Sequence, residues 1–226
     1  NNAITVADAG KITPRKLNIA MGDASKPYDG TIENTYSSIT GITDQPSSSA
    51  IGAILSGDNI TESGLNAAWQ ALRGAGNASS SYGRGTGNAF RGDANASNGN
   101  PHDVRYTEMD TAFDRAFSAV VGNYTVDKNV FGKGTITRRN ISPNNFDVVD
   151  AHGNVTNATK TYDGTSVYNK PSDFKLSPQS GPGTGVITQD AARIRFGIDP
   201  NKGAHFTDNA GNETANTFEA TRVAYH

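Results

Sequence analysis

The fold of this chain is organised around a short stretch, Lys26-Pro27-Tyr28-Asp29-Gly30-Thr31, which recurs as Lys160-Thr161-Tyr162-Asp163-Gly164-Thr165. The segment in front of each copy recurs as well, as Ile12-Thr13-Pro14-Arg15 before the first and Ile136-Thr137-Arg138-Arg139 before the second. An internal repeat decides the architecture of a chain before the chemistry of any single residue is considered. The sequence therefore predicts one folding module that occurs twice.

The shared Tyr-Asp-Gly tripeptide predicts a turn at the same place in each module. Asp-Gly is typical of type I′ β-turns, because both residues tolerate the positive φ that the two central positions require. We expect the tyrosine ring to pack beneath this turn, and we interpret the tripeptide as a structural corner rather than a binding site. The residues concerned are Tyr28, Asp29, Gly30, Tyr162, Asp163 and Gly164.

The segments that lead into the two copies are also related. Gly10-Lys11-Ile12-Thr13 is similar to Gly134-Thr135-Ile136-Thr137, and Asn2-Ala3-Ile4-Thr5-Val6 is similar to Asn123-Tyr124-Thr125-Val126. Both pairs combine a polar turn with alternating apolar residues, which is typical of a β-strand. Each module therefore begins where a strand of this pattern ends.

These patterns divide the chain. We predict that residues 1–12 are the closing strand of a preceding repeat, that residues 13–136 form the first repeat, and that residues 137–226 form the second. The second repeat contains no further copy of the closing pattern. We therefore expect it to be one or more strands short, with a sheet edge that is exposed or paired with something else.

Two further motifs extend the pattern, namely Gly122-Asn123-Tyr124-Thr125-Val126 and Phe206-Thr207-Asp208-Asn209-Ala210-Gly211. In this order the motifs resemble the YDG-type repeats of large bacterial surface adhesins of the filamentous-haemagglutinin kind. The resemblance implies an extracellular protein of the bacterial cell surface, in which tandem repeats form a non-enzymatic stalk and contact neighbouring repeats of the same chain. Residues 44–106 are longer and more irregular than the family pattern, so we interpret them as an insertion in the first repeat.

The composition excludes several classes of function. The 226 residues carry a net charge of −2 with a pI near 6.1 and no basic stripe, which argues against a nucleic-acid partner. No apolar run approaches the ~20 residues of a membrane span, so membrane insertion is not expected. Cysteine is absent, which fits either a cytosolic protein or a surface protein exported unfolded, and the resemblance favours the second.

The polar residues are mostly Asn, Ser, Thr and Gly, which favours turn-rich β structure. Helical periodicity is confined to two places. One helix is predicted from Thr61 or Ser63 to Gly74, and a second over 107–121 with Thr107 and Asp110 as a capping box. We predict a mainly β, α+β fold of two tandem β-grasp-like repeat domains, with an immunoglobulin-like β-sandwich as the alternative.

The expected insertion contains the residues that we assign to ligand binding. Residues 74–102 are rich in glycine and read as a long surface loop, and long loops in compact domains usually have a function. Aromatic and arginine side chains dominate contact energy when they are exposed. The candidates are Trp69, Tyr82, Arg84, Phe90 and Arg91, with a host glycan or an extracellular protein as partner. For Trp69 the competing interpretation is a core residue on the apolar face of its helix.

No catalytic residues are assigned, and the chain is not expected to be an enzyme. The four histidines do not have the spacing of a zinc site, and Asp150 with His152 reads as a turn pair. We expect no cofactor, with calcium bound loosely at 199–203 and at Asp208-Asn209 as the alternative. The alternative functions are a secreted carbohydrate-binding module, which needs aligned exposed rings, and a carbohydrate-active enzyme, which needs two acids in a cleft.

Overall fold

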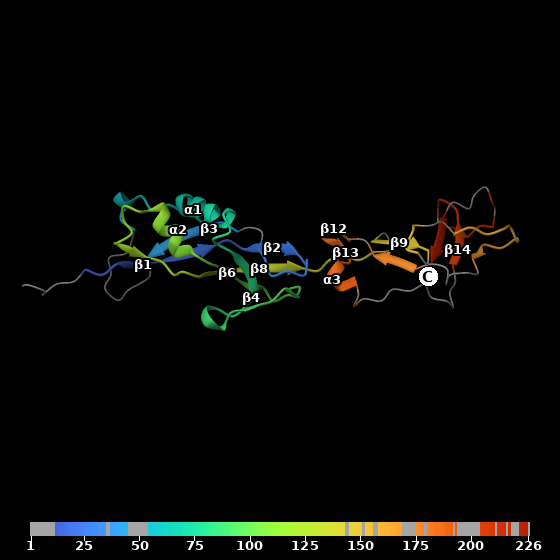
Figure 1. Cartoon of the computed structure of the whole chain (residues 1–226), viewed down its shortest axis with the longest axis horizontal. Coiled ribbons are helices and arrows are strands. Elements are labelled where there is room, and N and C mark those ends of the chain that lie inside the picture. The colour runs from blue at the N-terminus through green and yellow to red at the C-terminus, as the bar shows by residue number, and fades with distance from the viewer. Residues whose placement is uncertain are drawn as a thin grey trace, which may run out of the picture. The chain divides into compact units, whose positions relative to one another are not determined.

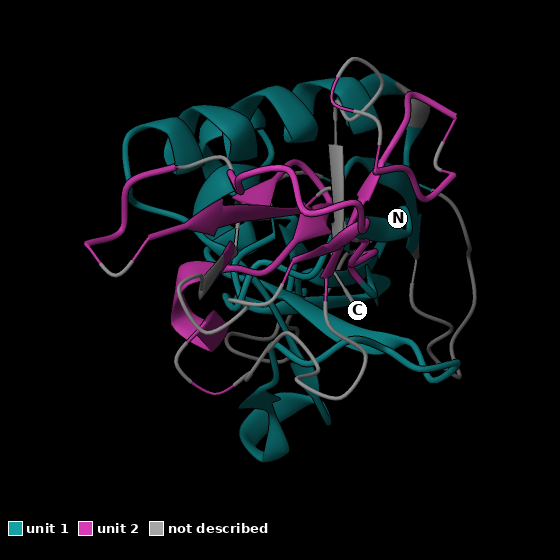
Figure 2. Cartoon of the chain, turned by 90° about the vertical axis from the view of Figure 1, so that its right-hand side faces the viewer, with its two compact units in different colours: residues 1–138 teal, residues 139–226 magenta. Residues whose placement is uncertain are grey.

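The structure is a computed structural model that divides the chain into two compact units, residues 1–138 and residues 139–226 (Figure 2). It describes residues 12–34, 37–44, 54–142, 145–150, 152–155, 158–168, 175–178, 180–191, 193, 204–210, 212–215, 217 and 222–225. Short strands predominate, and three short α-helices accompany them (Figure 1). The predicted mainly β, α+β class is confirmed. The strand predicted over residues 1–12 lies outside the described residues, except for Ile12.

The main sheet of unit 1 has five strands in the order β2-β8-β6-β4-β5. They are β2 (Ala24–Pro27), β8 (Val130–Thr137), β6 (His102–Tyr106), β4 (Ser80–Arg84) and β5 (Arg91–Gly92). β8 is parallel to β2 and antiparallel to β6, while β4 is antiparallel to both of its neighbours. The strand β8, which we call the closing strand of unit 1, therefore lies inside the sheet between β2 and β6.

A second sheet in unit 1 has the order β3-β1-β7. Its strands are β1 (Arg15–Met21), β3 (Ile39–Asp44) and β7 (Tyr124–Thr125). β1 alternates buried Leu17 and Ile19 with more exposed neighbours, as a strand with one covered face should. The short helix η1 (Ser56–Asp58) and the helices α1 (Glu62–Gly74) and α2 (Met109–Ala116) complete this side of the unit.

The core of unit 1 lies between its sheets and the two α-helices, which pack against each other (Figure 1). Thr61 caps α1 as predicted, because its hydroxyl accepts a hydrogen bond from the Gly64 amide at 3.1 Å. Trp69 is fully buried, and its indole Nε1 donates to the carbonyl of Thr107 at 2.9 Å. The Trp69 ring also meets the Tyr106 ring edge-on at 5.6 Å. The apolar face of α1 is therefore core, and this indole has no surface to offer a ligand.

The second helix differs from its prediction. It spans only Met109–Ala116, and Glu108 in front of it has a φ of 58°, so no capping box forms at Thr107. The Thr107 hydroxyl instead accepts from the Ser79 amide at 3.0 Å, next to β4. The hydrogen bond with Ser79 thus replaces the predicted cap of the helix. The apolar residues of this segment nevertheless face the core, since Met109, Ala112, Phe113 and Phe117 are buried.

The interpretation of residues 74–102 as a long surface loop is wrong, and central strands of the main sheet lie within the expected insertion, residues 44–106. β4 and β6 are central strands of the main sheet, and η2 (Gly87–Ala89) with β5 forms the end of a hairpin on β4. Its glycines made this segment look like a loop in the sequence, yet the strand β4 requires a glycine at position 83. A Cβ atom on Gly83 would lie 2.3 Å from the Arg91 carbonyl oxygen and 2.5 Å from the Phe90 ring.

Unit 2 is built from shorter strands. β10 (Val167–Tyr168), β14 (Ala204–Thr207) and β15 (Arg222–Tyr225) form one antiparallel sheet in the order β10-β14-β15. Two further pairs are β9 (Phe146–Val149) with β11 (Lys175–Pro178), and β12 (Ser180–Gly181) with β13 (Thr184–Gly185). The helix α3 (Thr188–Ala191) is a single turn.

Within the described part of both units, no helix is long and apolar enough to cross a membrane.

Candidate functional site

The first Tyr-Asp-Gly stretch forms a loop that is closed by a buried lysine. The side chain of Lys26, at the end of β2, is only 4% exposed. Its ammonium donates to Asp29 Oδ1 at 2.7 Å, to the Thr31 carbonyl at 2.8 Å and to the Thr31 hydroxyl at 2.9 Å. Asp29 Oδ1 also accepts from the Thr31 amide and hydroxyl, both at 2.9 Å. Lysine, aspartate and threonine thus form one closed hydrogen-bond network.

This loop is not the predicted type I′ hairpin turn. Gly30 has a φ of 78°, but Asp29 is not among the residues with positive φ, and a type I′ turn needs both. β2 ends before the loop and pairs with β8, whereas Glu33 after the loop forms a bridge with Ser81 of β4. The stretch therefore connects two different strands of the sheet. Aspartate accepts from the backbone two residues on, which is an Asx-type turn.

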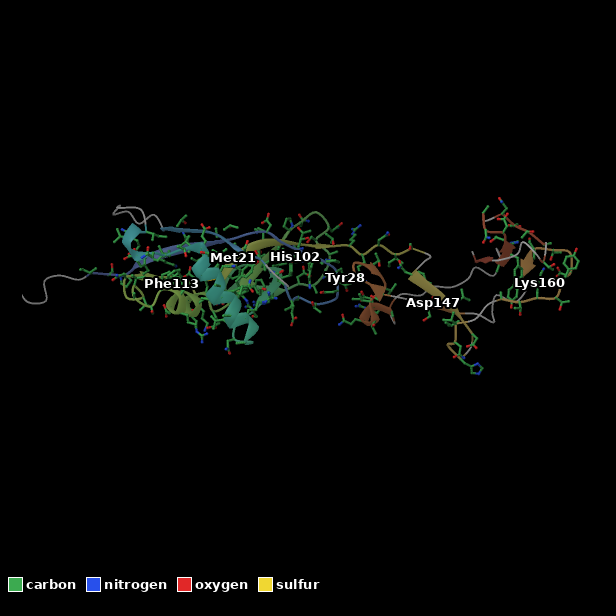
Figure 3. All side chains as sticks on the ribbon, turned by 90° about the horizontal axis from the view of Figure 1, so that it is seen from above. Met21, Tyr28, His102, Phe113, Asp147 and Lys160 are labelled. Atoms are coloured by element: carbon green, nitrogen blue, oxygen red, sulfur yellow. The ribbon has the colours of Figure 1, made fainter. Side chains whose placement is uncertain are left out.

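The second stretch repeats this network with the same atoms. The ammonium of Lys160 donates to Asp163 Oδ1 at 2.7 Å and to the Thr165 hydroxyl at 3.0 Å. Asp163 Oδ1 accepts from the Thr165 amide at 3.0 Å, and Gly164 has a φ of 77°. Figure 3 labels Lys160 among the side chains around this loop. The sequence copies therefore correspond to two copies of one loop geometry.

The strands after the loops are also in the same register. The Tyr82 amide donates to the Ile32 carbonyl at 2.7 Å, and the Phe206 amide donates to the Ser166 carbonyl at 2.8 Å. Each lysine ammonium lies over the ring of that aromatic residue, at 5.5 Å for Lys26 over Tyr82 and 5.8 Å for Lys160 over Phe206.

The correspondence continues across the sheet. Tyr82 pairs with Val104 on β6, and Phe206 pairs with Val223 on β15. On the other side, the carbonyl of Tyr82 accepts from the Asp93 amide and that of Phe206 accepts from the Thr214 amide. β14 and β15 in unit 2 are thus the counterparts of β4 and β6 in unit 1. The two loops hold equivalent positions in equivalent sheets.

The same hydrogen bonds set the acidity of the loop aspartates. Burial alone would raise the pKa of Asp29, but the hydrogen bonds from Lys26 and Thr31 outweigh burial and lower it. The hydrogen bond from Lys160 and those from Thr165 lower the pKa of Asp163 to about 2. Both carboxyl groups are therefore ionised at neutral pH and serve as fixed acceptors for the loop.

Three of the five predicted ligand-binding residues are buried. Trp69 and Tyr82 are fully buried, and Phe90 is 7% exposed beneath the guanidinium of Arg105, which lies 4.6 Å from its ring. The desolvation of the Tyr82 hydroxyl raises its pKa to about 12. These aromatic rings pack the sheet, so the proposed contact of these rings with a ligand is not supported by their positions.

The two arginine side chains are exposed, and their hydrogen bonds go to the hairpin that carries them and to the loop beside it. Arg84 Nε donates to Asp93 Oδ2 at 3.0 Å, and its Nη1 donates to the carbonyls of Asn100 and Pro101 at 3.2 and 3.1 Å. Arg91 Nη1 donates to the carbonyls of Asn88 and Phe90. Of the five candidates, only these two side chains lie on the surface, where they stabilise the end of the β4–β5 hairpin.

A serine, a histidine and an aspartate meet beside this hairpin, a cluster that sequence reasoning did not find. His102 Nδ1 lies 2.9 Å from Ser97 Oγ, and His102 Nε2 lies 3.2 Å from Asp93 Oδ2. Burial and the nearby Arg84 charge lower the pKa of His102. The hydrogen bonds to Asn95 and Arg84 outweigh burial and lower the pKa of Asp93 to about 2.

The geometry of this cluster suits structure rather than nucleophilic catalysis. Ser97 is 5% exposed, and its hydroxyl oxygen accepts a hydrogen bond from the Ile136 amide at 2.8 Å. The Ser97 amide in turn donates to the Ile136 carbonyl at 2.8 Å. His102 is completely buried. The cluster therefore fixes the end of β8 to the loop before β6, with both the serine and the histidine buried.

Other predicted polar sites form local turns. Asp150 Oδ1 accepts from the amides of His152 and Asn154, so this pair is a turn as expected. Asp208 Oδ1 accepts from the amides of Ala210 and Asn212 in the same way. The other calcium candidate, 199–203, lies outside the described residues. Within the described residues, no three His, Asp or Glu side chains gather as a metal site would require.

Comparison of the chain with protein-family models, with curated proteins and with solved structures found no match. The internal duplication and the polar clusters of the two units are therefore the features from which a function can be inferred.

Proposed function

We propose that this chain is a non-enzymatic segment of a bacterial cell-surface adhesin, in which tandem YDG-type repeats act as a spacer. The observation that carries the proposal is the repetition of one lysine-aspartate-threonine loop, with the same partners, in two equivalent sheets. Repeated units that each form their own sheet supply length and display in extracellular proteins.

The position of the polar clusters supports a structural role. The Lys26 and Lys160 networks close loops, and the His102 cluster joins β8 to a neighbouring segment. The aromatic rings of the first unit are used for packing. A carbohydrate-binding module would need several aligned exposed rings, whereas Tyr162 is the one aromatic side chain among the strongly exposed large apolar residues that the structure describes.

A display experiment tests the spacer function. A non-adherent bacterium would carry a binding domain of known target on its surface through zero, one or two copies of the full chain, and the target would be fixed beneath a polymer layer. We expect capture of the target to rise with each copy. A Gly/Ser linker of equal length is the matched control, because its reach grows only as about the square root of residue number. Equal capture by the chain and the flexible linker would refute the spacer function.

Direct ligand binding through the β4–β5 hairpin requires a separate test. Full-length chain would be screened against glycans and extracellular-matrix proteins beside the double variant Arg84→Ala, Arg91→Ala. A ligand of this surface binds the original chain and loses at least ~tenfold in affinity with the variant. Lys133→Ala, a change at an exposed side chain of β8, is the matched control. Binding that both variants retain would place the ligand elsewhere on the chain.

A further inference from the structure

Unit 2 contains a groove at the place where unit 1 holds its closing strand. The groove has a volume of about 240 Å³. Its walls come from the second loop, from β14 and from the segment after it, and the lining residues are Ala158, Thr159, Lys160, Tyr162, Thr165, Phe206, Thr214, Ala215 and Thr217.

The equivalent residues of unit 1 show what fills this space. Ala158 corresponds to Ala24, and Phe206 corresponds to Tyr82. In unit 1 both of these counterparts surround Gly134 of β8, where a Cβ atom would lie 3.1 Å from Ala24 Cβ and 2.7 Å from Tyr82 Cε1. A strand with glycine at this point thus occupies the position of the groove in unit 1.

The strands on the two sides of this position are equivalent as well. In unit 1, β8 pairs with β2 on one side and with β6 on the other. In unit 2 the counterpart of β6 is β15, which pairs with β14, and no other described strand pairs with it. An unpaired strand edge beside a groove is a template for a further strand.

A stretch of sequence with the required pattern exists elsewhere in the chain. Gly10-Lys11-Ile12-Thr13 matches Gly134-Thr135-Ile136-Thr137 of β8 at three of the four positions, including the glycine and the isoleucine. Ile136 is 1% exposed in unit 1, whereas Ile12 is 99% exposed. The same side chain that is buried in one copy of the pattern is therefore fully exposed in the other.

We infer that the groove of unit 2 binds the Gly10–Thr13 stretch of a second copy of the chain, which is added there as a strand in the position that β8 has in unit 1. In unit 1, Ala24 aligns with Gly134 and Lys26 with Ile136. The same register aligns Gly10 with Ala158 and Ile12 with Lys160. The Tyr28 amide donates to the Thr137 carbonyl in unit 1, so the Tyr162 amide donates to the Thr13 carbonyl in the complex.

This contact joins two different surfaces, the Gly10–Thr13 stretch of one copy and the groove of unit 2 in the next. Such heterologous contacts do not close on themselves and therefore produce head-to-tail chains. The inference is independent of the spacer function, because it depends on the groove and on Ile12 rather than on display at a cell surface.

Sedimentation velocity of the full chain over a range of concentrations up to about 1 mM tests the inference. We expect the original chain to form oligomers of increasing size. Ile12→Asp places a charge where Ile136 is buried, and Ala158→Trp fills the groove; each should weaken association at least ~tenfold. Both positions have exposed surface in the free chain, so the variants should fold. Lys11→Thr is the matched control, because it reproduces the sequence of β8 at an outward position, and its association should be unchanged.

A mixture of the two variants gives the decisive result. Ile12→Asp retains the groove and Ala158→Trp retains the strand, so the two should form one-to-one dimers that do not grow further. A monomeric original chain at every concentration would overturn the inference. So would association that Ile12→Asp leaves intact, or a failure of the two variants to form a dimer.

Discussion

The two units build the same loop in different surroundings. In unit 1, Lys26 is buried, and β8 lies against the strand that carries it. In unit 2, Lys160 is 19% exposed and Tyr162 is 67% exposed beside a groove. The hydrogen bonds among the six residues of each loop are nevertheless the same. The comparison teaches that the loop geometry is local, being set by lysine, aspartate, glycine and threonine, whereas its burial depends on a strand that is distant in sequence.

The largest expected effect concerns the core that unit 1 has around α1. Trp69→Ala removes a fully buried indole and its hydrogen bond to Thr107, and we expect it to lower the free energy of unfolding of unit 1 by about 4 kcal/mol. Hydrogen exchange of peptides from each unit during chemical denaturation measures this. Unit 2 should be unaffected. Val121→Ala, at a side chain that is 40% exposed, is the control, and an equal loss in both variants would contradict the assignment of Trp69 to the core.

The next effect compares the two lysines directly. Lys26→Met leaves Asp29 and the Thr31 carbonyl without their buried donor, so we expect unit 1 to lose about 2 kcal/mol in its free energy of unfolding. Lys160→Met removes the same bonds where water can replace them, and the loss in unit 2 should be smaller. Unit-resolved denaturation curves of the two variants check this. A larger loss for Lys160→Met would show that local contacts outweigh burial.

A smaller effect is expected from the buried side chain of His102 in unit 1. Its pKa in the folded state lies below the ordinary value of 6.5, so the unfolded state binds more protons between these two values. The stabilisation is complete above about pH 6.5 and is lost as the pH falls towards the folded pKa. The charged groups beside His102 are Asp93, Arg84 and Asp103.

The denaturation midpoint of unit 1, measured between about pH 7 and pH 5, reports this loss. In His102→Asn the midpoint should be lower at neutral pH and should depend less on pH. His152→Asn is the control, because the His152 side chain is 86% exposed. If His102→Asn kept the original pH dependence, another group would be responsible.

The duplication could be predicted from sequence because it is local. The six residues of each loop contain the hydrogen-bond acceptors of its lysine, and the Val167 carbonyl beside Lys160 is the one addition. The helix around Trp69 followed from its cap and its apolar spacing. The strand β4 could not be predicted in this way, since Gly83 is selected by a close approach of Phe90 and Arg91 rather than by strand propensity. The cluster of Asp93, Ser97 and His102 was missed because its geometry depends on the Ile136 amide, which comes from another strand.

The smallest expected effect concerns the pKa of Asp163, which separates the contribution of the loop's own residues from that of distant strands. Asp163 is exposed, yet its pKa lies near 2 instead of 3.8 because Lys160 and Thr165 donate to it. A carboxyl group with a lowered folded pKa stabilises the folded state above its unfolded pKa, and this contribution is lost as the pH falls from about 4 to about 2.

NMR titration of the aspartate carboxyl carbons should give Asp163 a midpoint near 2. Thr165→Val removes the hydroxyl donor but keeps the amide, so the midpoint should move part of the way back. Thr159→Val, outside the network, should leave it unchanged, and a midpoint near 3.8 in the original chain would show that the loop of unit 2 does not hold its geometry without a strand beside it.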